Sequence, residues 1–118
     1  LPPLVGVQTE VCAPIASGFE AGKAAPLPVS EGETVAEGIR ITSPYRGGEV
    51  LQAVRDSAGR MVTVAEAEIM PGRDALSAGG LYVEPTSAVV WQGVRHVLSF
   101  LEDPVVAVLT GSGLKYTA

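Results

Sequence analysis

The stretch Leu4-Val5-Gly6-Val7-Gln8, together with the residues from Cys12 to Gly22 that follow it, indicates how this chain folds. The first run is short and mostly apolar and ends at a polar turn, which is typical of a buried strand. The second run has helical character, with Pro14 near its first turn and Gly22 as a stop signal. A strand followed directly by a helix predicts one unit of an α/β protein.

The same alternation continues toward the end of the chain. Met61-Val62-Thr63-Val64 consists of residues that favour extended structure and predicts a further strand. Val105-Val106-Ala107-Val108-Leu109 is uninterrupted and apolar, which is typical of a central parallel strand buried on both faces. These runs predict an α/β fold with a mainly parallel sheet flanked by helices. Because such strands need neighbours on both sides, we expect the chain to form an incomplete part of a larger sheet.

Helical patterns fill much of the remaining sequence. Residues 43–59 begin at Ser43-Pro44 and present an apolar face. Residues 65–79 have helical composition, but Pro71-Gly72 in the middle predicts a kink or an end at Met70. Residues 85–101 predict a strong helix, and Pro104 follows its end. The residues that we expect this helix to bury are Val89, Val90, Val94, Val97 and Leu98.

The segments between these elements are rich in turn signals. Residues 23–33 are rich in proline and glycine and predict a surface loop, whereas residues 34–41 are ambiguous between turn and extended chain. Thr110-Gly111-Ser112-Gly113 follows the last predicted strand. Ligands of open α/β sheets bind at the carboxyl ends of strands, and glycine lets the backbone approach a ligand closely. A tight turn explains these residues equally well, and longer phosphate-binding glycine patterns are absent.

Composition and charge exclude several classes of protein. Eight Lys and Arg against thirteen Asp and Glu give a formal net charge of −5. Because the cations are few and unclustered, we expect no nucleic-acid partner. A hydrophobic content of 47% with 18% charged residues excludes a disordered chain. No apolar run reaches the roughly 18 residues of a membrane helix, so we expect no membrane partner.

Length and cysteine content suggest the setting. The 118 residues fit one domain or one segment of a larger domain, and a first residue of Leu1 instead of methionine favours a segment. Cys12 is the single cysteine and has no internal disulfide partner. That fits a reducing compartment, so we expect a cytoplasmic protein.

Residue types alone identify few candidates for chemistry. Glu84 precedes a proline and two hydroxyl residues, which fits a helix start, although its carboxylate could instead face a ligand. His96 is expected on the surface or partly packed, and Cys12 as a small buried hydrophobe. These residues form no metal-ligand cluster. Lys23 and Lys115 lack the apolar surroundings that activate a lysine for Schiff-base chemistry.

Four segments in sequence order carry a resemblance to a known family. They are Gly6-Val7-Gln8-Thr9-Glu10-Val11-Cys12-Ala13-Pro14-Ile15, Thr34-Val35-Ala36-Glu37-Gly38-Ile39-Arg40-Ile41, Leu81-Tyr82-Val83-Glu84-Pro85-Thr86-Ser87-Ala88 and Val108-Leu109-Thr110-Gly111-Ser112-Gly113-Leu114-Lys115. Read together, they resemble threonine synthase and its relatives, which are pyridoxal-phosphate enzymes of the tryptophan synthase β-type fold (fold-type II). The resemblance covers nearly the whole chain, but only about the last third of a family member.

The resemblance implies a pyridoxal 5'-phosphate site and roles for particular residues. Thr110 matches the family's hydroxyl residue that faces the pyridine nitrogen. A carboxylate there would hold this nitrogen protonated, whereas a neutral hydroxyl need not, and an unprotonated ring is a weaker electron sink. Two glycines of the same loop would let it pass the ring edge. The other positions that the resemblance assigns to the cofactor pocket are Gly111, Gly113, Glu84, Ala36, Glu37 and Gly38.

The complete enzyme implied by this resemblance converts O-phosphohomoserine, a small amino-acid substrate, to threonine and phosphate. It is a carbon–oxygen lyase acting on phosphate. Its Schiff-base lysine lies in the earlier part of family members, so we expect residues 1–118 to be the C-terminal portion of the cofactor-binding large domain and inactive alone. We expect them to associate with the remainder of the enzyme or in a homo-oligomer.

Two alternatives remain open at this point. The first is a threonine or serine dehydratase-type β-lyase of the same fold. The second is a non-catalytic module or one subunit of a split enzyme.

Overall fold

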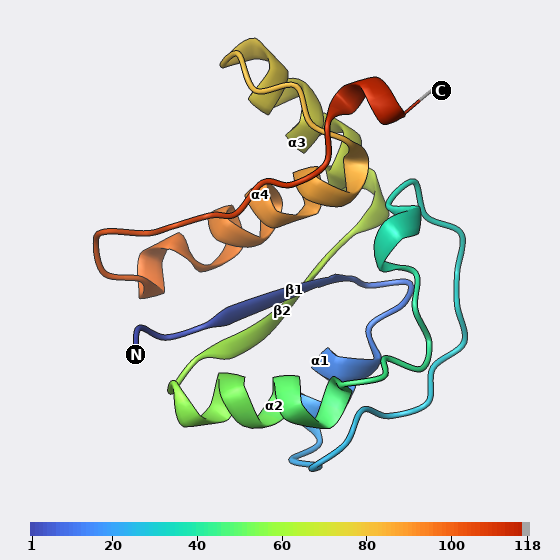
Figure 1. Cartoon of the computed structure of the whole chain (residues 1–118), viewed down its shortest axis with the longest axis vertical. Helices are drawn as coiled ribbons and strands as arrows, with labels where there is room; N and C mark the ends of the chain where they lie inside the picture. Colours follow the sequence, from blue (N-terminus) through green and yellow to red (C-terminus); the bar gives the residue numbers. More distant parts are fainter. Residues whose placement is uncertain (117–118) are drawn as a thin grey trace.

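The computed structural model describes residues 1–116 and has the predicted α/β character (Figure 1). In sequence order the helices and strands are β1 (Val5–Thr9), α1 (Pro14–Glu20), α2 (Gly47–Asp56), β2 (Arg60–Val64), α3 (Glu66–Ala78) and α4 (Pro85–Val97). Short 3-10 turns occupy Glu37–Ile39, Leu98–Phe100 and Gly113–Lys115. No helix among residues 1–116 is long and apolar enough to cross a membrane.

The two strands pair in parallel, from Val5 opposite Arg60 to Thr9 opposite Val64. Parallel neighbours need a long crossover connection, and here α1 and α2 lie in it. Figure 1 shows the strands between α4 on one side and α1 and α2 on the other. The helix α4 approaches β1 closely, since a Cβ on Gly93 would lie 2.7 Å from Cγ1 of Val7. The predicted parallel sheet flanked by helices is therefore confirmed.

The strand β1 also fixes where α1 begins. The side-chain oxygen Oε1 of Gln8 accepts hydrogen bonds from the backbone N–H groups of Ile15 at 3.1 Å and Ala16 at 3.0 Å. These are amides of the first helical turn, which have no partner within the helix. Gly22 ends the segment in a left-handed conformation, with φ of 67°, as its stop signal predicts. Cys12 is fully buried, as expected of a small hydrophobe.

The hydrophobic core joins the sheet to both α4 and the segment around residue 36. Its central cluster buries Ala36, Val64, Ile69 and Val89, with Val7, Val35 and Ile39 packed against it. A second cluster between α3 and α4 contains Leu76, Val83 and Ala88, with Trp91 and Leu109 at its edge. Burying an aliphatic side chain contributes about 1.5–3 kcal/mol, so the first cluster holds residues 34–39 against the start of α4.

The prediction of a central strand at residues 105–109 is wrong for this structure. The segment is irregular and partly open to solvent, with Val106 84% exposed and Val108 66% exposed. In Figure 1 it follows α4 and has no strand beside it in the described part of the chain. Its apolar composition favours a buried strand, but a strand also needs neighbours that accept its backbone hydrogen bonds.

The predicted break at Pro71 is also wrong, because α3 runs without interruption from Glu66 to Ala78. Pro71 is exposed, and the adjacent Gly72 packs against the side chain of Gln92 on α4. The amide Nε2 of Gln92 also donates to the carbonyl oxygen of Glu68 at 2.7 Å. An interior proline costs a helix about 3 kcal/mol, and packing against α4 offsets that cost.

Other boundaries differ from the sequence patterns by a turn or less. The helix α2 begins at Gly47, after a turn that contains Pro44, rather than at Ser43. Residues 23–33 form an irregular loop, as predicted. On α4, Val89 and Val97 are buried and Val90 and Val94 are half-buried, whereas Leu98 is 55% exposed because the α-helix ends before it.

Candidate functional site

The first turn of α4 is the meeting point of the candidate site residues. Glu84 is the residue before the helix, and Pro85 opens it. The loop at residues 110–113 lies against this turn, and so does the 3-10 turn Glu37–Ile39. Segments far apart in the sequence are thus brought to one place by a single helix end.

Backbone hydrogen bonds attach the 110–113 loop to the residues that precede α4. The N–H of Glu84 donates to the carbonyl oxygen of Gly111 at 3.0 Å, and the N–H of Gly113 donates to that of Tyr82 at 3.0 Å. Val83 and Ser112 form an antiparallel bridge between these bonds. The loop is consequently fixed in register with the start of the helix.

Ser87, in the first turn of α4, holds the same loop from inside. The serine is 3% exposed, and its Oγ accepts from the N–H of Thr110 at 2.8 Å and from the N–H of Gly111 at 3.1 Å. Its Oγ also lies 3.1 Å from Oγ1 of Thr110. The local sequence pattern indicates Ser87 only as part of a helix start. Its position within the motif shared with the family is the one signal that it belongs to the site.

The two glycines of the loop are required by close contacts within the chain. A Cβ on Gly111 would overlap the carboxylate of Glu84. A Cβ on Gly113 would lie 2.7 Å from the ring of Tyr82. Both glycines are buried, while Thr110 is exposed. The tight approach that the glycines permit therefore presents the threonine on the outside of the loop.

The second group of candidate residues is tied to α4 through Thr86. Its Oγ1 accepts from the N–H of Gly38 at 3.2 Å, and a Cβ on Gly38 would lie 3.0 Å from the same oxygen. Ala36 is fully buried, and its N–H donates to Oγ1 of Thr34 at 3.0 Å. Glu37 is exposed and borders a surface pocket. The two groups of candidates thus lie beside neighbouring hydroxyl residues of one helical turn.

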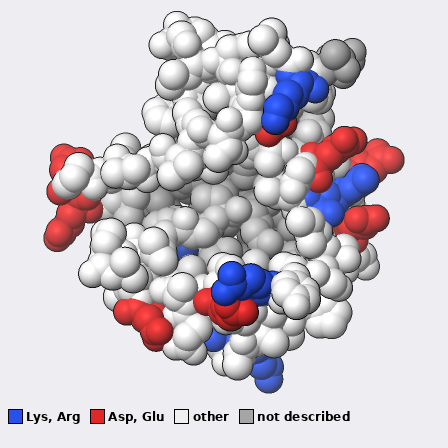
Figure 2. All heavy atoms as spheres, viewed as in Figure 1, with Lys and Arg blue, Asp and Glu red and all other residues white. Residues whose placement is uncertain are grey.

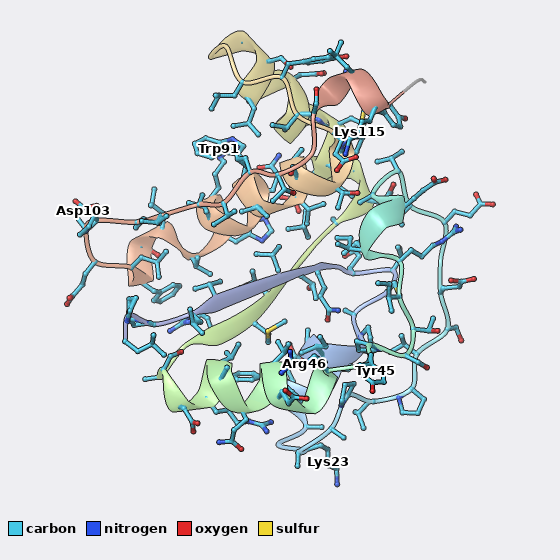
Figure 3. All side chains as sticks on the ribbon, in the orientation of Figure 1. Lys23, Tyr45, Arg46, Trp91, Asp103 and Lys115 are labelled. Carbon is cyan, nitrogen blue, oxygen red and sulfur yellow. The ribbon has the colours of Figure 1, made fainter. Side chains whose placement is uncertain are left out.

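The remaining residues considered for chemistry lie in other surroundings. His96 Nε2 lies 2.7 Å from Oε1 of Glu68, which links α4 to α3. This hydrogen bond lowers the pKa of Glu68. Lys23 and Lys115 are exposed, and Figure 3 shows them at opposite ends of the view. The described residues contain no cluster of His, Cys, Asp and Glu suited to a metal ion.

The Thr110 loop fits the edge of the pyridoxal phosphate ring that the resemblance implies. Thr110 offers a neutral hydroxyl, and the buried Ser87 stands behind it at hydrogen-bond distance. A hydroxyl can donate a proton to a ring nitrogen or accept one from it. The donor set therefore suits a pyridine nitrogen, and the overlap at Gly111 shows that the loop admits no larger side chain without rearrangement.

Comparison with known protein families gives one match across most of the chain. The family model described as "Pyridoxal-phosphate dependent enzyme" matches residues 1–111. Threonine synthase of Methanosarcina acetivorans is 34% identical over 120 residues, which cover 98% of this chain and 30% of that protein. Threonine synthase of Synechocystis is 37% identical over 105 residues, which cover 83% of this chain and 28% of that protein. The chain thus spans about 30% of the length of the curated relatives that it matches.

Solved structures share the fold at lower sequence identity. A bacterial threonine deaminase, from the organism abbreviated T.th., superposes with a TM-score of 0.76 at 23% identity, covering 97% of this chain and 41% of that chain. Maize serine racemase superposes with a TM-score of 0.59 at 21% identity, covering 75% of this chain and 27% of that chain. These likenesses establish the fold and leave the reaction to be argued from the site.

Proposed function

The chain belongs to the pyridoxal-phosphate dependent enzyme family, and from that premise we propose that it is part of a threonine synthase-like enzyme. The complete protein would convert O-phosphohomoserine and water to threonine and phosphate. The observation that carries this proposal is 34% identity to a threonine synthase over 98% of the chain. The aligned stretch takes in the α4 start and the 110–113 loop, where the candidate site residues meet.

Within this proposal, the chain supplies the ring-nitrogen side of the cofactor site. Pyridoxal phosphate, when bound, supplies an electron sink for carbanions formed on the amino-acid substrate. The hydroxyl of Thr110 would face the ring nitrogen, and being neutral it would not hold that nitrogen protonated as a carboxylate does. Gly111 and Gly113 keep the loop against Glu84 and Tyr82, so the hydroxyl has a fixed position.

The segment around residue 37 would form an adjacent wall of the same site. Gly38 is held by Thr86, one residue before Ser87 on α4. Ala36 is locked in the hydrophobic core, so this wall has little freedom to move away from the helix. Glu37 is exposed at its edge, where its carboxylate can meet solvent or a substrate group.

We also propose that residues 1–118 pack against the remainder of the enzyme or a second copy, in the cytoplasm. Large apolar side chains near the end of α4 are open to solvent, with Phe100 66% and Val106 84% exposed. In Figure 2 the charged side chains of the visible face lie mostly around its rim, and the centre, over β1 and β2, is largely uncharged. Uncharged, apolar surface of this kind is typical of an interface. A monodisperse monomer of residues 1–118 in light scattering would contradict this association.

The function is tested on the longest natural reading frame that contains residues 1–118. The proposal predicts release of inorganic phosphate and formation of threonine from O-phosphohomoserine. Thr110→Ala should reduce this activity, while Thr42→Ala, on a loop outside the site, serves as the matched control. Formation of a keto acid from threonine or serine without phosphate release would favour a dehydratase instead. A protein that binds no pyridoxal phosphate and has neither activity would refute the proposal and leave a non-catalytic module.

A further inference from the structure

The hydrogen bonds around Ser87 determine the direction in which its proton points. A serine hydroxyl has one proton to donate and two lone pairs to accept with. The N–H groups of Thr110 and Gly111 both donate to Ser87 Oγ, at 2.8 and 3.1 Å. With both lone pairs engaged, Ser87 can enter a further hydrogen bond only as the donor. The bond of 3.1 Å to Oγ1 of Thr110 therefore runs from the serine to the threonine.

This direction decides what Thr110 can do on its exposed side. Because its Oγ1 accepts the proton of Ser87, its own proton is not spent on that bond. Had the bond run the other way, the threonine proton would point inward, and the hydroxyl could only accept from a ligand. A hydroxyl that accepts one hydrogen bond is also polarised into a better donor. Thr110 is exposed, so its proton is available to a ligand outside the loop.

We propose that Ser87 is a positioning residue that turns the proton of Thr110 outward, so that Thr110 donates to the unprotonated ring nitrogen of pyridoxal phosphate. The inference rests on the proposed function, since it requires the cofactor to lie against this loop. Hydrogen bonding to the neutral form of a base disfavours its charged form. Ser87 thereby biases the ring toward its neutral state although it does not touch the ring. Two main-chain amides, which side-chain substitutions retain, set this bias.

The test separates the directional role of Ser87 from its role in holding the loop. The full-length protein is titrated with pyridoxal phosphate and with a deaza analogue, in which C–H replaces the ring nitrogen and nothing can accept from Thr110. The readout is the ratio of the two dissociation constants. For the unsubstituted protein we expect about tenfold preference for pyridoxal phosphate, the equivalent of about 1.4 kcal/mol and within the range of one hydrogen bond.

Substitutions at the pair should move this ratio in a defined way. Ser87→Ala and Thr110→Val should bring the ratio close to one, while Ser87→Thr and Thr110→Ser, which keep the hydroxyls, should preserve most of the preference. Thr110→Val leaves the bonds from Ser87 to the backbone in place, so it remains informative even if Ser87→Ala does not fold. Ser77→Ala on α3 is the matched control and should leave the ratio unchanged.

The outcomes distinguish this inference from the function on which it rests. If Ser87→Ala weakens both ligands equally, the serine only holds the loop, and the inference is overturned. If the unsubstituted protein binds both ligands equally but still releases phosphate from O-phosphohomoserine, the inference fails while the proposed function stands. If the protein binds neither ligand, both fail together.

Discussion

Replacing Gly111 with alanine tests whether the 110–113 loop is held as tightly against α4 as the structure indicates. A Cβ at this position would overlap the carboxyl group of Glu84. The backbone of Gly111 is not in the left-handed region, so the cost of the substitution comes from space alone. Either the glutamate swings away or the loop moves and strains its hydrogen bonds to Glu84 and Ser87.

The magnitude follows from the cost of overpacking. Inserting a methyl group into filled space costs typically about 1–3 kcal/mol. We expect Gly111→Ala to lower the free energy of unfolding by this amount and to weaken cofactor binding. Truncating the half-exposed Glu84 to alanine should cost about 0.5 kcal/mol by itself, as for other surface positions. In the double variant the overlap is gone, so the two substitutions should couple favourably by about 1 kcal/mol or more.

Urea denaturation of the four proteins of this cycle measures the coupling. Gly79→Ala is the matched control, because a Cβ there would make an ordinary contact of 3.4 Å with the carbonyl oxygen of Leu76. It should change the free energy of unfolding by less than about 0.5 kcal/mol. The reasoning is refuted if Gly111→Ala is as neutral as Gly79→Ala, or if the effects of Gly111→Ala and Glu84→Ala simply add.

Other predictions concern the framework that carries the site. Gln8→Ala removes the acceptor of two amides at the start of α1, so it should cost about 1–2 kcal/mol in urea denaturation, like the loss of a helix cap; the exposed Gln52→Ala should cost much less. The hydrogen bond from His96 lowers the pKa of Glu68 below its ordinary 4.5, so the stabilisation by the charged carboxylate is present above pH 4.5 and is lost as the pH falls through the lowered pKa. Denaturation midpoints across this range should show a shallower acid-side decline for Glu68→Gln, and an unchanged decline would contradict the assignment.

The parts of the fold that the sequence predicts correctly rest on local signals. The strand at residues 5–9 and the turn at Gly22 follow from short apolar runs and from a glycine with positive φ. The helix α4 is predictable because a proline opens it and its apolar residues recur at helical spacing. Such features are properties of neighbouring residues, so they can be recognised without knowing what packs on them.

The features that sequence patterns missed depend on distant partners. Residues 105–109 have the composition of a strand but lack a neighbouring strand in the described part of the chain. The helix α3 continues through Pro71 because Gln92 of α4 supports it. The bonds between Ser87 and Thr110 span 23 positions, and no periodicity links a serine in a helix start to a threonine in a loop. The resemblance to a family identified Thr110, but only the structure joined it to Ser87.

The protonation state of the cofactor ring tests the central claim most directly. The full-length protein would be loaded with pyridoxal phosphate labelled with ¹⁵N in the ring, and the ¹⁵N chemical shift recorded for it and for Thr110→Asp. The account predicts an unprotonated ring nitrogen beside Thr110 and a protonated one beside the aspartate, because a carboxylate favours the charged ring. If the two proteins give the same chemical shift, Thr110 does not face the ring nitrogen and the account is contradicted.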